Sequence, residues 1–235
     1  MIEVIPAILA ENFKELSEGI SRVANNSRVI QIDICDGNFV PSVSWPYDEI
    51  HSGGNNLEAI LSEEEGLPCW DRVNFEFDLM VRNAHEQFDF FMKLGPRRIV
   101  FHIEAEMEGE DIGKFKEFLE GIDMYTRDNL EIGVSINTTT DIKILEPIIG
   151  SVDFVQCMGI ERIGFQGEPF DERVLSQIAS LRTKYRELII SVDGSVNENT
   201  APLVVKAGAN RLIVGSLLSR GYDTQEIIKY LENLD

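Results

Sequence analysis

The sequence predicts an α/β protein, a single (β/α)8 TIM barrel formed by residues 1–235. Eight short apolar runs alternate strictly with amphipathic stretches, a pattern that is typical of a parallel sheet. Several runs lack polar alternation, as expected for strands buried on both faces. The length of 235 residues lies near the typical barrel size of about 250 residues. A doubly wound open sheet is the alternative interpretation of the same pattern.

The predicted strands are rich in isoleucine, valine and phenylalanine. Their order along the chain gives the eight βα units that a closed barrel requires. The strands cover Val4–Leu9, Val29–Cys35, Val73–Met80, Arg98–Ile103, Glu131–Ile136, Val152–Met158, Leu188–Val192 and Arg211–Val214.

Each strand-like run precedes a stretch with apolar residues at helical spacing, such as Phe13, Leu16 and Ile20 after the first run. Residues 42–71 form the longest connection, so we expect an extended loop or hairpin inserted there. The predicted helices are Asn12–Ala24, Leu57–Glu65, His85–Leu94, Asp111–Arg127, Asp141–Ile149, Glu172–Tyr185, Asn199–Ala207 and Asp223–Leu234.

The charge balance excludes several classes of partner. With 41 acidic and 21 basic residues the net charge is −20, which disfavours binding to nucleic acid or to anionic lipid. No apolar run approaches the roughly 20 residues that a membrane helix needs, and residues 1–10 lack a basic start typical of a signal peptide. Three widely spaced cysteines predict neither a disulfide framework nor a cysteine zinc site, and we expect a cytoplasmic protein.

Three carboxylates follow or end apolar strands, where a barrel places its functional groups. They are Asp33, Asp78 and Asp193. Any one of them could cap a helix or pair with an arginine, but three on apolar strands would be costly to bury without a role. His102 lies on the fourth strand, and we expect it to be a hydrogen-bonded pocket or core residue. The sequence therefore predicts a pocket lined by carboxylates.

Glycine-containing turns follow the last three strands, where barrels often bind phosphate through backbone N–H groups. Met80 and Met158 lie where their strands would reach the same pocket. Cys35 and Cys157 are expected in the core, and Arg98 at the face of the barrel that supports stability. The candidate phosphate- and substrate-binding residues of the turns are Gly164, Phe165, Gln166, Gly194, Ser195, Gly215 and Ser216.

These motifs together resemble the ribulose-phosphate 3-epimerase family over almost the whole chain. The resemblance implies inversion of C3 of a ketopentose 5-phosphate through an enediolate, with Asp33 and Asp193 exchanging acid and base roles. It also implies a (β/α)8 fold and a phosphorylated ketose as substrate, and it suggests a homo-oligomer. The matching segments are Ile5–Phe13, Gln31–Pro41 (QIDICDGNFVP), Asp78–Val81, His102–Ala105, Gly164–Gly167, Val192–Val196, Ala207–Asn210 and Gly215-Ser216.

Several positions depart from the family pattern. The family holds a divalent metal with two histidines and the two aspartates, but Gln31 and Asp78 stand at the histidine positions. Two serines of the first strand are replaced by Ala7 and Ala10, and the loop after strand six is lengthened. An oxygen-only set favours Mg²⁺ or Mn²⁺ over Zn²⁺. The metal ligands expected from the resemblance are Gln31, Asp33, Asp78 and Asp193.

Three interpretations of function stay open at this point. The chain is an epimerase with a hard-metal or altered site, it acts on a related ketose phosphate, or it binds a phosphosugar without turnover. The retained aspartate pair favours an enzyme, and the missing histidines favour a binding protein.

Overall fold

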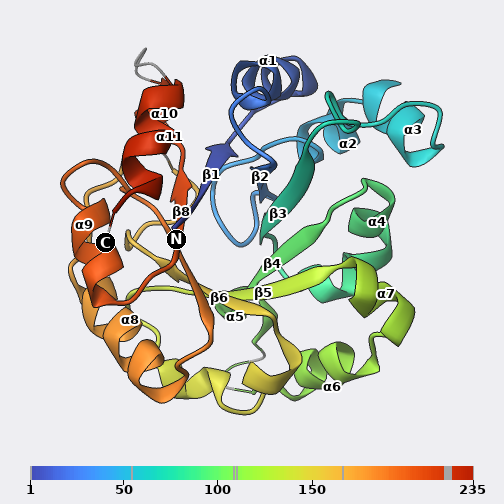
Figure 1. Cartoon of the computed structure of the whole chain (residues 1–235). Helices are drawn as coiled ribbons and strands as arrows, with labels where there is room; N and C mark the ends of the chain where they lie inside the picture. Colours follow the sequence, from blue (N-terminus) through green and yellow to red (C-terminus); the bar gives the residue numbers. More distant parts are fainter. Residues whose placement is uncertain are drawn as a thin grey trace.

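The computed structural model describes residues 2–53, 55–107, 109, 111–165, 167–219 and 224–234. Eight parallel strands follow one another around a closed barrel, and β1 pairs with both β2 and β8 (Figure 1). The closure confirms the TIM barrel and excludes the open sheet. The strands are β1 Glu3–Ile8, β2 Val29–Cys35, β3 Asn74–Met80, β4 Arg98–His102, β5 Glu131–Ile136, β6 Phe154–Met158, β7 Ile189–Asp193 and β8 Arg211–Val214.

Helices surround the ring of strands (Figure 1). The first begins where the Asn12 side chain accepts a hydrogen bond from the Glu15 N–H, and it buries Leu16 and Ile20 against the strands. The helices are α1 Phe13–Val23, α2 Tyr47–Ser52, α3 Asn55–Leu61, α4 Phe88–Lys93, α5 Ile103–Glu106, α6 Gly113–Gly121, α7 Met124–Asn129, α8 Arg173–Lys184, α9 Ala201–Ala207, α10 Ser216–Ser219 and α11 Thr224–Glu232, with 3-10 turns η1 Ala84–Gln87, η2 Ile142–Leu145 and η3 Ile149–Ser151.

Several predicted helices differ from the structure. The helix expected over 85–94 consists of the 3-10 turn η1 followed by α4, and the helix expected over 57–65 is α3, which covers Asn55–Leu61. The helix expected over 111–127 is divided into α6 and α7, because Asp123 has extended backbone and caps a new helix through the Thr126 N–H. The helix expected over 141–149 consists of the 3-10 turns η2 and η3, since Pro147 lacks an N–H and blocks a continuous helix. Residues 42–71 contain α2 and α3 rather than a hairpin.

The interior of the barrel contains many polar side chains, whereas the space between strands and helices is apolar. Leu16, Phe115 and Ile178 are fully buried in the outer layer. Inside the ring the buried side chains include amides, hydroxyls and charged groups, several of which hydrogen-bond or form ion pairs with one another. These interior residues are Gln31, Glu76, Asp78, His102, Ser135, Gln156, Ser191 and Arg211.

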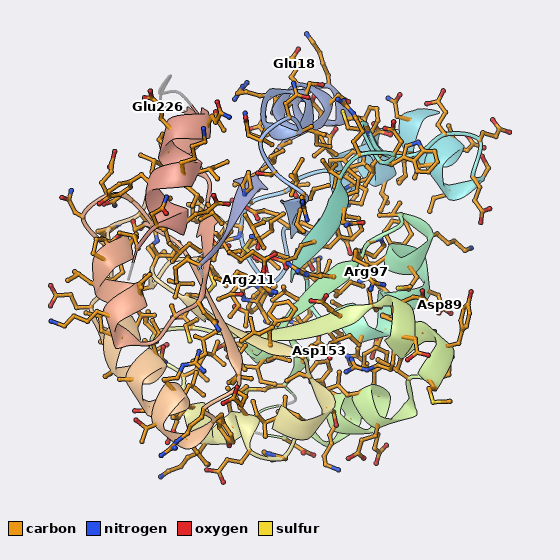
Figure 2. The ribbon with its side chains drawn as sticks, in the orientation of Figure 1. Glu18, Asp89, Arg97, Asp153, Arg211 and Glu226 are labelled. Carbon is orange, nitrogen blue, oxygen red and sulfur yellow. The ribbon has the colours of Figure 1, made fainter. Side chains whose placement is uncertain are left out.

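One end of the interior is closed by an ion-pair cluster at the beginnings of the strands. Arg211 lies at the centre of the ring of strands (Figure 2) and its Nε is 2.7 Å from Glu3 Oε2. Arg98 contacts Glu3 and Glu131, each at 2.9 Å, and both arginines face Glu76. Burial raises the pKa of Glu76 to about 7, although the two arginines lower it. Arg98 therefore lies at the N-terminal end of the barrel strands, away from the predicted site, as the sequence analysis expected. Among the described residues, no helix combines the length and apolar character needed to cross a membrane.

Candidate active site

Three carboxylates meet at the opposite end of the barrel interior. Asp33 of β2 lies directly beside Asp78 of β3 in the parallel register, and Asp193 ends β7. One oxygen from each carboxylate lies within 4.8 Å of the other two. Barrel closure thus brings together residues separated by up to 160 positions (193 − 33) in the chain. All three line one cavity.

Gln31 joins the two aspartates that come from distant strands. Its Nε2 donates to Asp33 Oδ1 and to Asp193 Oδ2, both at 2.8 Å. Gln31 is fully buried, so this amide is held in a dry environment where its hydrogen bonds to carboxylates are strong. Its Oε1 is also buried and has no hydrogen-bond partner in the described structure.

The electrostatics of the cluster favour bound protons. Burial and the nearby charge of Asp78 raise the pKa of Asp33 to about 7, while the Gln31 amide opposes the rise. Burial and the charges of Asp33 and Asp78 raise the pKa of Asp193 well above its ordinary value, again against the Gln31 hydrogen bond. Both carboxylates therefore hold a proton to a higher pH than an exposed aspartate does.

His102 supports Asp78 from the neighbouring strand. Its Nε2 lies 3.0 Å from Asp78 Oδ1, and Gln156 Nε2 donates to the same oxygen at 3.3 Å. Burial lowers the pKa of His102, but the Asp78 charge and hydrogen bond outweigh it, and the pKa is raised. The expectation of a hydrogen-bonded interior histidine is confirmed, and its partner is one of the three site carboxylates.

The glycine turns line the same cavity as the carboxylates. Gly164, Gly194 and Gly215 line it together with their neighbours Phe165, Ser195 and Ser216, and so do the two methionines Met80 and Met158. Gly164 has a φ of +84°, and a Cβ there would lie 2.8 Å from Val40 Cβ, so this turn requires glycine. The predicted residue Gln166 lies outside the described residues.

Glu168 is a cavity residue that the sequence interpretation missed. Its side chain is 22% exposed and lines the cavity beside the glycine turns, and its backbone carbonyl accepts a hydrogen bond from Ser195 Oγ. The sequence signal was a charged residue three positions after Phe165, directly after Gly167. Such a residue usually belongs to a solvated surface, and nothing in its local pattern indicated a pocket.

Comparison of the sequence with protein-family models shows which family the chain belongs to. The model of the ribulose-phosphate 3 epimerase family matches residues 3–219. The chain belongs to the ribulose-phosphate 3-epimerase family. Named ribulose-phosphate 3-epimerases from Eremothecium gossypii and Bacillus subtilis are 27% and 29% identical, covering 98% and 97% of this chain and 91% and 97% of theirs. The sequence analysis leaned toward an enzyme of an isomerase family, and the family comparison confirms that membership.

Solved structures agree with the barrel fold of this epimerase family member. A 3-keto-L-gulonate-6-phosphate decarboxylase from Vibrio cholerae superposes with a TM-score of 0.66 at 12% identity, covering 100% of this chain and 97% of the other. At that identity the similarity supports the fold alone.

A divalent metal is general in the ribulose-phosphate 3-epimerase family, and the three carboxylates form a cluster able to hold one. The donor set fits a hard cation, because it consists of oxygens that lie within 4.8 Å of one another. Asp78 Oδ2 and Gln31 Oε1 are also buried without a hydrogen-bond partner among the described residues, so each has an unused acceptor. Gln31 faces the aspartates with its nitrogen, so ligation through Oε1 requires rotation of the amide.

Proposed function

We propose that the protein interconverts D-ribulose 5-phosphate and D-xylulose 5-phosphate by inverting C3 through two-base proton transfer. The observation that carries this proposal is the pair Asp33 and Asp193. The buried Gln31 amide donates to both carboxylates, and the pKa of each is raised. Inversion needs one group to remove a proton and a second to deliver one to the opposite face. The family membership and the cavity that links the pair to the glycine turns support the same assignment.

The two aspartates are suited to opposite roles at neutral pH. Asp33, with a pKa raised to about 7, has an ionised fraction that accepts the C3 proton. Asp193, with a pKa raised well above its ordinary value, retains a proton that it donates to the other face. Gln31 donates to both carboxylates and holds them in position, and the reverse reaction exchanges the roles.

The phosphate of the substrate is assigned to the N–H groups of the turns at Gly164, Gly194 and Gly215. Asp33, Asp78 and Asp193 would hold Mg²⁺ or Mn²⁺ in preference to Zn²⁺, and the ion would supply positive charge that stabilises the enediolate. Cytoplasmic location and assembly into a homo-oligomer stay predictions.

The direct test combines epimerisation of ribulose 5-phosphate with deuterium incorporation at C3 in D₂O, in the presence of Mg²⁺, Mn²⁺ or Zn²⁺. D33N and D193N should each lower the rate by roughly 10²- to 10⁴-fold, the usual contribution of a general acid or base. Absence of both turnover and exchange with every metal would refute the proposal.

A second candidate function is a barrel that binds a phosphosugar without turnover. It is favoured because Gln31 stands where the family resemblance implies a metal-binding histidine. The Gln31 amide donates a hydrogen bond to one oxygen of Asp33 and one of Asp193. Those oxygens are then engaged by the protein, which is compatible with a site that does not transfer protons. Calorimetric titration with ribulose 5-phosphate separates the candidates: binding without exchange at C3 supports the binding protein, and any exchange excludes it. Turnover of another ketose phosphate, with none of ribulose 5-phosphate, would instead indicate a related epimerase.

A further inference from the structure

The cavity assigned to a phosphosugar is lined by carboxyl groups and not by basic side chains among the described residues. Among the described residues that line it are Asp33, Asp78, Asp193 and Glu168, and none of those described is lysine or arginine. Glu168 faces the same cavity as the glycine turns, so its charge opposes a phosphate dianion. The chain as a whole carries −20 and offers no general attraction. A basic side chain close to these turns would therefore strengthen the phosphate binding that their backbone N–H groups provide.

We infer that Arg162, in the loop between β6 and α8, is a phosphate-binding residue that pairs with Glu168 until the substrate phosphate takes its place. The inference rests on the proposed function, because it assumes that the ligand carries a phosphate at the glycine turns.

Arg162 contacts two residues of the cavity wall. Its Nη1 lies 3.8 Å from Glu168 Oε1, and its guanidinium lies over the Phe165 ring at 5.2 Å from the centroid. Both partners line the cavity, and Phe165 is directly next to Gly164. The Arg162 side chain is 70% exposed, so its pairing with Glu168 is long, solvent-screened and weak. A guanidinium held this loosely can exchange a single carboxylate for a phosphate, which it binds with two parallel hydrogen bonds.

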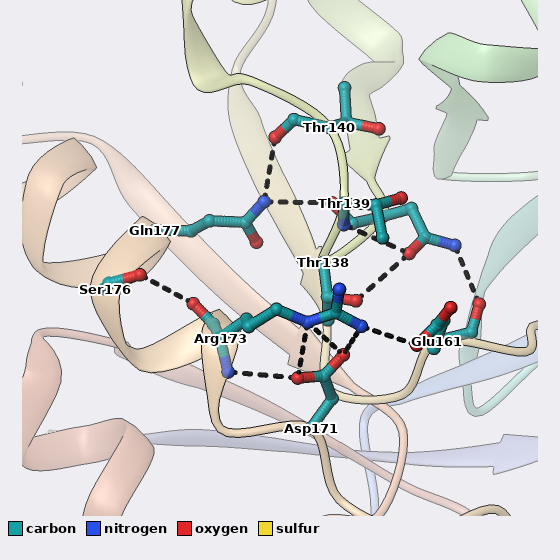
Figure 3. Close-up of polar contacts among 9 residues, drawn as sticks. Thr138, Thr139, Thr140, Glu161, Asp171, Arg173, Ser176 and Gln177 are labelled. Atoms are coloured by element: carbon teal, nitrogen blue, oxygen red, sulfur yellow. Dashed lines mark hydrogen bonds and ion pairs between the residues drawn. The ribbon is translucent and has the colours of Figure 1, made fainter.

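The base of the loop that carries Arg162 is fixed. Arg173, at the start of α8, contacts both Asp171 and Glu161, with Nη2 at 2.5 Å from an oxygen of each (Figure 3). The Asn137 side chain donates to the Glu161 carbonyl at 2.9 Å, and the Asp171 N–H donates to the Gly159 carbonyl at 2.8 Å.

This network places Arg162 one residue beyond an anchored position. The hydrogen bonds of Arg173 lower the pKa of Asp171, so this anchor stays ionised at the pH of any binding assay. Arg173 has its charge engaged by two carboxylates, whereas Arg162 keeps a charge that phosphate can use.

Binding of inorganic phosphate, measured by calorimetry at low ionic strength, tests the inference without depending on turnover. R162Q should raise the dissociation constant by about 5- to 20-fold, the range for losing one charge-assisted contact at an exposed site. E168Q should lower it, because it removes a repulsive charge and releases Arg162. The KM for ribulose 5-phosphate should follow the same order, with kcat changed much less.

R82Q is the matched control. Arg82 is also exposed and lies over a phenylalanine, Phe39, at 5.2 Å, but it donates to the Glu104 carbonyl, and none of these three residues lines the cavity. R82Q should leave phosphate binding unchanged. If the wild-type protein binds phosphate and R162Q binds it equally well, the inference is wrong and the proposed function is untouched. If the wild type binds neither phosphate nor ribulose 5-phosphate, both are wrong.

Discussion

Gln31 gives the sharpest test of the two-aspartate site. Q31L keeps a side chain of similar size but removes the amide that donates to Asp33 and Asp193 at 2.8 Å. Both carboxylates then lose a hydrogen bond that favours their ionised form, in an interior where burial already favours the neutral form. We expect the pKa of each aspartate to rise.

The size of the effect follows from the geometry. A hydrogen bond to a charged group contributes roughly 1.5–3 kcal/mol, and about 1.4 kcal/mol corresponds to one pKa unit. The pKa of Asp33, about 7 in the wild type, should therefore rise by roughly one unit or more in Q31L. At pH 7 the ionised fraction of Asp33 would fall from about one half to about one tenth. The rate of C3 proton removal should fall by about fivefold at pH 7 and recover above pH 9.

Two measurements check this expectation. Carboxyl ¹³C titration of the metal-free protein follows the pKa of Asp33 directly, and the pH dependence of kcat/KM follows the same ionisation in the enzyme. Q156L is the control, because Gln156 is an equally buried amide that donates to Asp78 and Met158 but to neither Asp33 nor Asp193. The reasoning is refuted if Q31L lowers the rate equally at all pH values, with unshifted carboxyl titrations, in a protein that remains folded by circular dichroism.

Three further predictions concern stability and ligands. Burial raises the pKa of Glu76 to about 7, so between about pH 4.5 and pH 7 the folded state holds a proton that the unfolded state has released. The stabilisation that comes from this proton is lost as the pH rises through that range. The free energy of unfolding of E76Q, measured in urea, should therefore decline less than that of the wild type between these pH values. D78N should weaken Mn²⁺ binding, measured by calorimetry, at least tenfold. The affinity of the wild type for Mn²⁺ should rise with pH as Asp33 and Asp193 release protons. Equal Mn²⁺ affinities of D78N and the wild type would exclude the three-carboxylate site. G194A forces a side chain into a φ of +102° and to 2.7 Å from Ile160 Cγ1, so it should destabilise the protein by about 1–3 kcal/mol and weaken phosphate binding; an unchanged melting temperature would contradict this.

The strands were predictable because barrel strands are buried on both faces and therefore form nearly continuous apolar runs. The ends of the helices were less predictable, since they depend on local competition between backbone partners. Asp123 illustrates the point, because an aspartate inside an amphipathic stretch can lie on an exposed helix face or begin a new helix. Pro147 was a stronger signal, and its missing N–H explains the 3-10 turns that replace the expected helix.

The three site carboxylates were predictable from their position at the ends of apolar strands, where a charged side chain requires an explanation. The hydrogen bonds of Gln31 were not, because its contact with Asp193 spans 162 positions and exists only once the barrel closes. Asp78 and His102 are likewise neighbours through strand pairing alone. Glu168 lines the cavity and was missed, because an acidic residue in a loop is typical of a solvated surface.

The three carboxylates explain why the departures at Gln31 and Asp78 matter for binding a divalent metal. Replacing two imidazoles with Gln31 and Asp78 leaves a site with three carboxylates, of which Asp78 is paired with His102. Without a cation, burial first and the repulsion among the carboxylates second favour bound protons, and together they raise the pKa values of Asp33 and Asp193. A divalent ion and these protons therefore compete for the same oxygens. It follows that added Mg²⁺ or Mn²⁺ should shift the acidic limb of the pH–rate profile to lower pH, and that the shift should grow with metal concentration.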